Sequence, residues 1–484
     1  MRRFVLPVLA VALAHCGSGS QSTYVPPVID PHAAPGDCGL DHPAFCETFE
    51  SPSPGGRGGD LDETNWSFAR WGHQVQYMWE RGPASTYADR LYPATFCGQP
   101  FAGILPDADV KICPGYGVDG KASNQLNEVF DDGGDFALNS MRIRQPFDFT
   151  GRTGKLVWDV DAKVNPINLG HGWWFELWIT ADPSPLPYHQ APTVTSYPRQ
   201  GVGLAFQFGA DCPEDDSGAA DGWKGKVGWQ SALESLHVSD GYQIVHDTPF
   251  WELDQTGDRC FRVADAHLNH FELRISKSRA ELWASDYDDP STLKLRTAIP
   301  VLDLPFERGY VHFQHGQYNA SKDGLTGCNG ENGQCPTRAQ TFRWDNIGFD
   351  GPTHPTPRSY DVADPMIPGA GGGMRFGWFL NEGPQTFTFN NVDLSNASAA
   401  SFNFMMDGGP GTQLQYTVNA AAPHMFTYPE TTGKPGGIHG FSAQLPVAEL
   451  QTGVNTITVK RMDKAPANVQ SGIGYVDLTI EVSK

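Results

Sequence analysis

The chain has 484 residues, of which 39% are hydrophobic and 18% are charged, and it contains 54 glycines and 38 prolines. This composition favours many short strands joined by turns and disfavours long helices, because glycine and proline both destabilise a helix interior. The net charge of −21 repels phosphate, so it excludes nucleic acid as an expected partner.

A short basic start and an apolar run from Phe4 to Ala14 open the chain. The run is too short to span a bilayer, so residues 1–16 are predicted to be an export signal. Its end, LAHC, resembles the lipobox of bacterial lipoproteins, except that His15 stands where a small residue is usual. The resemblance implies lipid attachment at Cys16 and a place in the cell envelope, at the outer membrane or cell surface. The alternative is an ordinary signal with an unrelated cysteine.

The cysteines fit an exported chain. There are nine, so eight remain besides Cys16, and an oxidising compartment lets an even number pair as disulfides. Proximity in the sequence is the only guide to their partners. It predicts four pairs: Cys38 with Cys46, Cys97 with Cys113, Cys212 with Cys260, and Cys328 with Cys335.

Two stretches without periodicity divide the chain. Residues 17–37 are predicted to be a flexible tether, so that the membrane is reached through a lipid anchor only. A segment dense in proline and glycine, residues 351–373, separates two globular parts. We place the first domain at 38–357 and the second at 358–484.

Alternation of apolar and polar residues runs through the first domain. Period two with turn residues between the runs predicts half-buried antiparallel strands, and many such strands without helical stripes predict a sandwich or jelly roll. The segments with this pattern are SMRIRQPFDF, KLVWDVDAKV, VGLAFQFG, HFELRIS, AELWAS, YVHFQHG and TFRWDNIGF.

One of these strands, WWFELWIT at residues 173–180, suggests a binding site. Its odd positions are all apolar, so we expect that face in the core. Its even positions place Glu176 between Trp174 and Trp178. Sugar rings stack on indoles and their hydroxyls bond to carboxylates, so this face is predicted to be a concave, solvent-reachable sugar platform. The alternative is that a loop covers both indoles and that Glu176 pairs with an arginine.

Two further strands bear on the same site. In VGLAFQFG, small residues and Gln207 share one face, which leaves room for a ligand; the alternative is a loop packed there. In YVHFQHGQYN, His312 and His315 are candidate acid–base groups, although a single histidine is more often structural.

A family resemblance supports the fold. FCETFESPSPGGRGGDLDETNW is similar to the opening of laminarinase- and lichenase-type β-glucanases, and TFRWDNIGFDG to the closing strand of the concanavalin A-like superfamily. The resemblance implies a concanavalin A-like jelly roll over residues 38–357. It also implies a structural calcium at Asp345, with Glu50 as a weaker candidate ligand. The alternative is that Asp345 caps a turn. The residues that carry the resemblance are Glu50, Leu61, Asp62, Trp66 and Asp345.

The catalytic motif of those β-glucanases, Glu-x-Asp-x-x-Glu, is absent. If Glu176 is its first acid, Trp178 and Ala181 stand where the other two acids belong. Retaining hydrolysis needs two carboxyl groups on one sheet face, so the family's activity does not carry over.

The second domain also alternates and ends in a segment that resembles galactose-binding-like jelly rolls, LPVAELQTGVNTITVKRM followed by GIGYVDLTIEV. Gly453 and Asn455 are predicted to form a hairpin turn. The aromatic side chains of His424, Phe426 and Tyr428 either bind sugar or pack.

Three functions compete. The first is a cell-surface carbohydrate-binding lipoprotein whose ligand is a polysaccharide or glycan. The second is a glycoside hydrolase or polysaccharide lyase with non-standard catalytic residues, Glu176 among them. The third is a structural or adhesive envelope protein. Tryptophan and amide groups with one acid favour the binder, whereas two nearby carboxyl groups favour the hydrolase.

Overall fold

A computed structural model describes the chain in segments. They are residues 38–50, 61–72, 94–96, 99–101, 110–114, 124–130, 136–161, 173–185, 189–191, 194–196, 200–208, 223–233, 261–263, 269–286, 289–299, 304–318, 340–362, 367–368, 374–375, 378–380, 383–408, 412–427, 437–462 and 472–483. Within them every element is a strand except one 3-10 turn, η4 (Val447–Glu449), and no helix there is long and apolar enough to cross a bilayer. The fold class is all-β, as predicted.

The first large sheet, sheet 1, has eight strands in the order β18-β17-β16-β9-β20-β6-β5, with β1 paired to β20. The strands are β1 (Pro43–Glu47), β5 (Val110–Pro114), β6 (Asn124–Phe130), β9 (Gly154–Asp161), β16 (Asn269–Ser276), β17 (Arg279–Asp286), β18 (Asp289–Ile299) and β20 (Gln340–Asp350).

The second large sheet, sheet 2, also has eight strands, in the order β15-β14-β13-β10-β19-β7-β2, with β8 paired to β19. The strands are β2 (Trp66–Gly72), β7 (Phe136–Ile143), β8 (Phe147–Asp148), β10 (Trp173–Thr180), β13 (Gln200–Phe208), β14 (Trp223–Leu233), β15 (Phe261–Val263) and β19 (Arg308–Tyr318). Two short hairpins lie outside these sheets: β3 (Ala94–Phe96) with β4 (Gln99–Phe101), and β11 (His189–Ala191) with β12 (Val194–Ser196).

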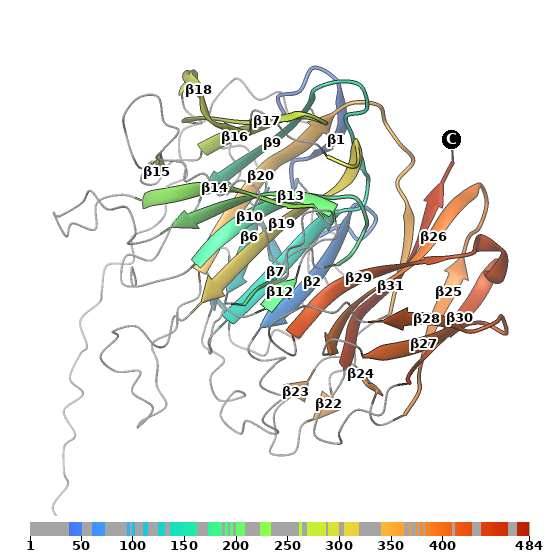
Figure 1. The fold of residues 1–484 in the computed structure, drawn as a ribbon. Coiled ribbons are helices and arrows are strands. Elements are labelled where there is room, and N and C mark those ends of the chain that lie inside the picture. The colour runs from blue at the N-terminus through green and yellow to red at the C-terminus, as the bar shows by residue number, and fades with distance from the viewer. Residues whose placement is uncertain are drawn as a thin grey trace, which may run out of the picture.

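The core lies between sheets 1 and 2, where the alternating patterns meet (Figure 1). Leu177 and Ile179 of β10 stand opposite Phe313 and Val311 of β19, and all four side chains are buried. Phe313 reaches across to sheet 1, where its ring lies 5.0 Å from that of Trp344. The odd positions of β10 whose side chains are described therefore face the core, as predicted. Burial of such side chains stabilises the fold by about 1.5–3 kcal/mol each.

The C-terminal strands form a smaller sandwich beside the first, orange to red in Figure 1. Sheet 3 has the order β21-β31-β26-β29 with β24 on β31, and sheet 4 has the order β25-β30-β27-β28. The strands of sheet 3 are β21 (Arg358–Asp361), β24 (Trp378–Phe379), β26 (Ala397–Gly408), β29 (Gly437–Leu445) and β31 (Gly472–Val482). The strands of sheet 4 are β25 (Gln385–Val392), β27 (Gln413–Val418), β28 (His424–Thr427) and β30 (Gly453–Arg461). A separate short hairpin pairs β22 (Ile367–Pro368) with β23 (Met374–Arg375).

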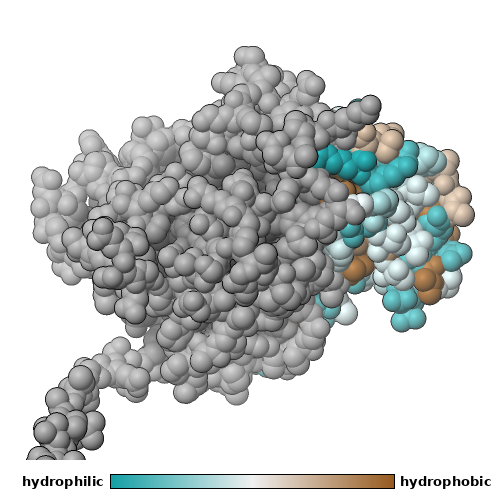
Figure 2. Space-filling view, turned by 90° about the horizontal axis from the view of Figure 1, so that it is seen from below, coloured by the Kyte–Doolittle hydropathy of each residue, from teal (hydrophilic) through white to brown (hydrophobic). Residues whose placement is uncertain are grey.

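The two sandwiches have separate cores. One buried cluster draws its residues from the strands up to Phe349, and the other from Leu380 onward. On the face seen in Figure 2, the coloured surface of the smaller sandwich mixes hydrophilic and intermediate residues, with hydrophobic spots scattered among them. The signal and tether predicted for residues 1–37 lie outside the described residues and stay predictions.

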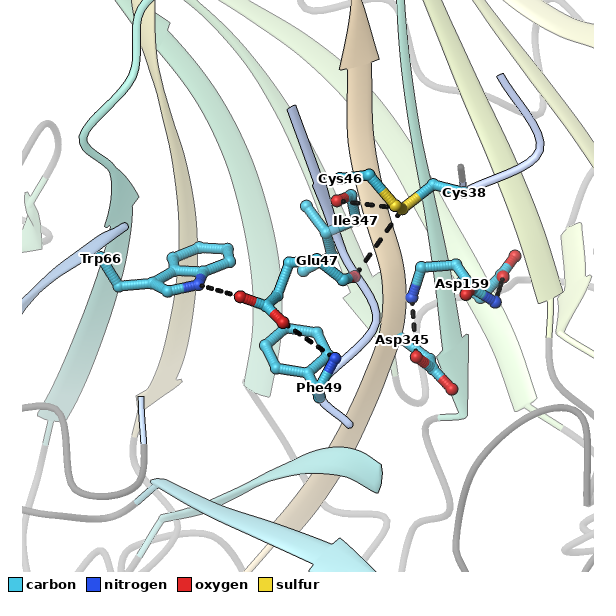
Figure 3. Close-up of a disulfide and its surroundings, with 9 residues drawn as sticks. Cys38, Cys46, Glu47, Phe49, Trp66, Asp159, Asp345 and Ile347 are labelled. Atoms are coloured by element: carbon cyan, nitrogen blue, oxygen red, sulfur yellow. Dashed lines mark hydrogen bonds between the residues drawn. A yellow bond between two sulfur atoms is a disulfide. The ribbon is translucent and has the colours of Figure 1, made fainter. Parts of the chain in front are cut away.

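The N-terminal segment is fastened to the outer face of sheet 1 (Figure 3). Cys38 and Cys46 form a disulfide, as predicted, and Cys38 packs with Leu40 and Val157 of β9. The other predicted pairs lie outside the described residues, except that the backbone of Cys113 is part of β5. Gly348 of β20 allows the close approach, because a Cβ there would meet the Cys38 side chain at 2.9 Å.

Candidate carbohydrate-binding face

We call the face of sheet 2 that points away from the core the front face. Strands β10, β13 and β19 place most of the predicted site residues there by backbone register. Trp174 of β10 stands opposite Gln207 of β13 on one side and Gly316 of β19 on the other. Directly opposed residues of antiparallel strands share a face, so Trp174 and Gln207 are neighbours.

Glu176 occupies the next row. It stands opposite Ala205 of β13 and Gln314 of β19, and Gln314 in turn stands opposite Ser140 of β7. Beyond β13, the same row continues to Gly228 of β14. The carboxylate thus shares its row with an amide and a hydroxyl on one side, while the positions on the other side carry almost no side chain.

Trp178 occupies the third row, opposite Gly203 and His312. Its side chain is only 1% exposed. The expectation that Trp178 is reachable by solvent is therefore wrong, although Trp174, Glu176, Trp178 and Gln207 do share one face by register.

The two histidines of β19 lie on opposite faces of sheet 2. His315 stands opposite Phe175, on the core side of sheet 2, whereas His312 lies on the front face. His312 is fully buried, and its Nε2 lies 2.9 Å from the hydroxyl of Thr180. Burial and the nearby charge of Arg142 hold its pKa well below the usual value, so the ring is neutral. This arrangement favours a structural role for His312.

The C-terminal sandwich covers the end of the front face that lies beyond Trp178. Arg142 of β7, which stands opposite His312, is buried and pairs with Asp477 of β31 at 3.4 Å. Its guanidinium also donates to the carbonyl of Pro183, in the segment that follows β10. Tyr310 of β19 donates a hydrogen bond of 2.9 Å to Glu481 of β31. Charged and polar groups of the described residues thus join the two sandwiches at this end.

The register adds residues to the site that the sequence reading missed. Gln314 lies directly beside Glu176, and Gln230 of β14 stands opposite Gly203. Period two along β19 already puts residues 312, 314 and 316 on one face. The pairing of β19 with β10 could not be predicted from the sequence, because the two strands are far apart in the chain.

On β2, β7, β10, β13, β14, β15 and β19, as far as the structure describes them, Glu176 is the only acidic residue whose register puts it on the front face. The remaining strand of sheet 2, β8, adds Asp148, which stands opposite Arg308, six positions along β19 from Gln314. A glycosidase of the usual type needs two carboxyl groups, one on each side of the scissile bond. Near Glu176 these strands therefore provide tryptophan, amides and one acid.

The predicted calcium ligand Asp345 lies on the outer face of sheet 1. Its carboxylate is buried, and its Oδ1 accepts a hydrogen bond of 2.8 Å from the backbone N–H of Asn346. Opposite it stands Asp159, whose two oxygens bind the Asn346 side chain and His270, both at 2.7 Å. Asn346 has a φ of 48°, at a bulge in β20.

These side chains do not supply a calcium site by themselves. Calcium takes six to eight oxygen ligands, and both oxygens of Asp159 already have protein partners. Among the described residues, no three acidic, histidine or cysteine side chains gather as metal ligands. Glu50 is exposed at the end of a described segment. Calcium at Asp345 stays a prediction.

The other residues of the glucanase-like motif have structural roles. Leu61 and Trp66 are buried in the core, and Asp62 accepts hydrogen bonds from Thr64 that shape the turn into β2. Glu47, which the sequence reading missed, accepts hydrogen bonds from the Phe49 amide and the Trp66 indole, at 3.0 and 3.4 Å (Figure 3). Burial raises the pKa of its carboxyl group.

The aromatic residues proposed for the second domain pack. His424 stacks on Tyr416 at 5.1 Å and bonds to Glu449 at 2.7 Å, while Phe426 contacts Phe441 at 4.8 Å. Tyr428 lies outside the described residues.

No family model and no curated protein matches the chain. Similar solved structures include lectin II from Ulex europaeus, at 10% identity and a TM-score of 0.31, covering 64% of this chain and 100% of that chain. A lectin from Bauhinia forficata in complex with GalNAc is 11% identical with a TM-score of 0.30, covering 52% and 96%. The exoplasmic/lumenal domain of VIP36 in its Ca²⁺/Man3GlcNAc-bound form is 14% identical with a TM-score of 0.27, covering 47% and 80%. At such low identities and TM-scores the bound sugars and calcium belong to those proteins, so the function of this chain rests on its own residues.

Proposed function

We propose that this chain is a carbohydrate-binding protein whose site is the part of the front face around Trp174, Glu176, Gln207 and Gln314. The observation that carries the proposal is the register of β10 between β13 and β19. It puts Trp174, Glu176, Gln207 and Gln314 at neighbouring front-face positions, next to Gly316 and Ala205, which carry little or no side chain. Indoles stack on the apolar faces of sugars, and amides and carboxylates bond to their hydroxyls.

Binding is favoured over hydrolysis because the other acid at a front-face position of the described strands of sheet 2, Asp148, stands opposite Arg308, about 20 Å along β19 from the row of Glu176. His312, the other candidate proton carrier there, is buried, neutral and bonded to Thr180. Hydrolase or lyase activity stays the alternative, with Glu176 as its acid–base group.

A glycan array with purified protein tests the proposal. Trp174→Ala should weaken binding of the glycan that the wild type takes by about 5- to 150-fold, because loss of one stacking ring costs about 1–3 kcal/mol by analogy with base–aromatic stacking. Trp283→Ala is the matched control, since Trp283 lies on the opposite, outer face of sheet 1 against Arg274. If the two variants bind as the wild type does while their circular dichroism is unchanged, the front face is not the site.

Glu176→Gln separates binding from catalysis. It removes the charge and keeps the shape, so a binder should keep most of its affinity. An enzyme that uses Glu176 should lose about 10²- to 10⁴-fold in turnover in a reducing-sugar assay.

We further propose that the chain is exported and held by lipid at Cys16. The Cys38–Cys46 disulfide supports export, since disulfides persist in oxidising compartments. Display at the cell surface would place the front face where extracellular glycans reach it.

A further inference from the structure

A buried histidine lies beside the ion pairs that join the two sandwiches. Arg142 of β7 reaches Asp477 of β31, and Arg144 reaches Asp361 of β21, at 3.4 and 3.0 Å. In both pairs the cation belongs to the first sandwich and the carboxylate to the second. His312 of β19 stands directly opposite Arg142, and both side chains are buried. A change of charge at His312 therefore acts next to a residue that holds the sandwiches together.

The hydrogen bonds of His312 leave one of its ring nitrogens without a partner. The hydroxyl of Thr180 donates to the carbonyl of Asp182 at 2.8 Å, so it does not also donate to the ring. Nε2 of His312, 2.9 Å from the same hydroxyl, is therefore the donor and carries the hydrogen. Nδ1 is then an unprotonated acceptor. In the part of the chain that the structure describes, neither this Nδ1 nor the Nε of Arg142 has a hydrogen-bond partner.

The closed junction has no place for a proton on Nδ1. The proton would find no acceptor, and it would put a second positive charge beside Arg142 in a buried position. The carboxylate that pairs with Arg142, that of Asp477, already balances the charge of the guanidinium. Burial and the charge of Arg142 accordingly hold the pKa of His312 well below its ordinary value. The other charged or titratable residues of the described chain around the two side chains are Arg144, Glu176 in the next row of β10, Asp182, Tyr310 and Asp361.

We propose that His312 is an acid-sensitive switch of this junction: when its ring takes up a proton, the second sandwich separates from the first. Separation lets Arg142 move away from the imidazolium and gives both cations access to water. The carboxylates of Asp477 and Glu481 leave together with β31, so Arg142 and Tyr310 lose the partners that hold them at the end of the front face. The switch does not depend on what the front face binds.

The direction of the pH effect follows from the proton count. The closed form keeps His312 neutral, whereas the ordinary pKa of histidine is 6.5. The closed form is therefore favoured in full above pH 6.5, and the closing equilibrium weakens below it by up to about tenfold per pH unit. Free carboxyl groups titrate near pH ~4, so an opening between about pH 6.5 and about pH 5 indicates a histidine.

Small-angle X-ray scattering of the full chain from about pH 7.5 to about pH 5, at constant ionic strength, tests the switch. The radius of gyration of the wild type should rise as the pH falls, while the circular dichroism of its strands stays unchanged. His312→Gln, whose amide can donate to Thr180 but does not titrate, should stay closed. His424→Gln is the matched control, because His424 is a half-buried histidine bonded within the second sandwich, and it should open as the wild type does. A constant wild-type radius, or equal opening of His312→Gln, would overturn the proposal.

Asp477→Asn supplies a second test in which His312 is retained. The imidazole NMR signal of His312, assigned by its absence from His312→Gln, reports the protonation of the ring. If protonation opens the junction, a loosened junction must bind the proton more readily, because linked equilibria are reciprocal. The apparent pKa of His312 should therefore be higher in Asp477→Asn than in the wild type. A closed junction predicts the opposite, since Arg142 would lose its counter-charge. An equal or lower pKa in the variant would thus contradict the switch.

Discussion

His270 carries charge at a half-buried position on the outer face of sheet 1. Burial lowers the pKa of its imidazole, but the carboxylates of Asp159 and Glu272 outweigh this effect and raise it to about 9. Its Nδ1 lies 2.7 Å from Asp159. Glu272 is itself held by Lys155 and Arg274, at 2.6 and 2.7 Å, and the pKa of its carboxyl group is lowered to about 2.

A pH dependence of stability follows. The folded-state pKa of His270 lies above the ordinary value of 6.5, so its contribution is complete below pH 6.5 and is lost as the pH rises through 9. The free energy of unfolding should therefore fall over this interval by on the order of 3 kcal/mol in the wild type. Urea unfolding of His270→Asn across the same interval should show a flatter profile. Parallel profiles for the two proteins would contradict this role of His270.

At the scale of strands, alternation predicted which residues face the core but not which strands meet. Leu177 and Ile179 lie in the core as the period-two pattern requires, because this pattern is local. The pairing of β10 with β19 joins segments more than a hundred residues apart, and no local pattern encodes it. Gln314 was therefore missed, while Gln207 was found from its own strand.

The predicted hairpin at Gly453 and Asn455 is wrong for a related reason. The preceding strand β29 belongs to sheet 3 and β30 belongs to sheet 4, so the segment between them crosses from one sheet to the other through η4. The side chain of Asn455 is buried and bonds to the backbone of Gln451, which holds this crossing. A turn signal in a sequence shows that the chain bends, but not which strands it joins.

At the scale of the whole molecule, the two sandwiches are joined by ion pairs that the sequence could not show. Arg144 of the first pairs with Asp361 of the second at 3.0 Å, and Arg142 pairs with Asp477. Asp477 also accepts a hydrogen bond of 2.6 Å from Asn403, and this bond within the second sandwich holds the carboxylate in position to pair with Arg142. These ion pairs join residues more than 200 positions apart in the chain, so no local pattern in the sequence indicates them.

Asp477→Asn tests this junction. It leaves the buried Arg142 without its counter-charge, which costs about 3–5 kcal/mol when one partner of a buried pair is removed. In calorimetry the transitions of the two sandwiches should move apart or shift to lower temperature. Asp393→Asn is the control, because Asp393 pairs with Arg358 at the surface of the second sandwich. Identical calorimetric traces for Asp477→Asn and the control would show that the pair does not hold the domains together.

Lipid attachment is tested by metabolic labelling. Radiolabelled palmitate should enter the wild-type protein and not Cys16→Ser, because the thiol is the acceptor. Equal labelling of the two would show that the chain is not a lipoprotein of this kind.

The N-terminal fastening sets the side of the first sandwich at which a lipid-anchored chain would be attached. Cys38 packs against Val157 on the outer face of sheet 1, so the chain leaves the first sandwich on the side opposite the front face. Residues 17–37 extend at most about 70 Å, which sets the radius within which a lipid at Cys16 holds the domain. A lipid at Cys16 would thus be attached on the side of the first sandwich opposite the front face. Attachment at that side would keep the anchor away from the front face, so anchoring and ligand binding at the front face would not compete.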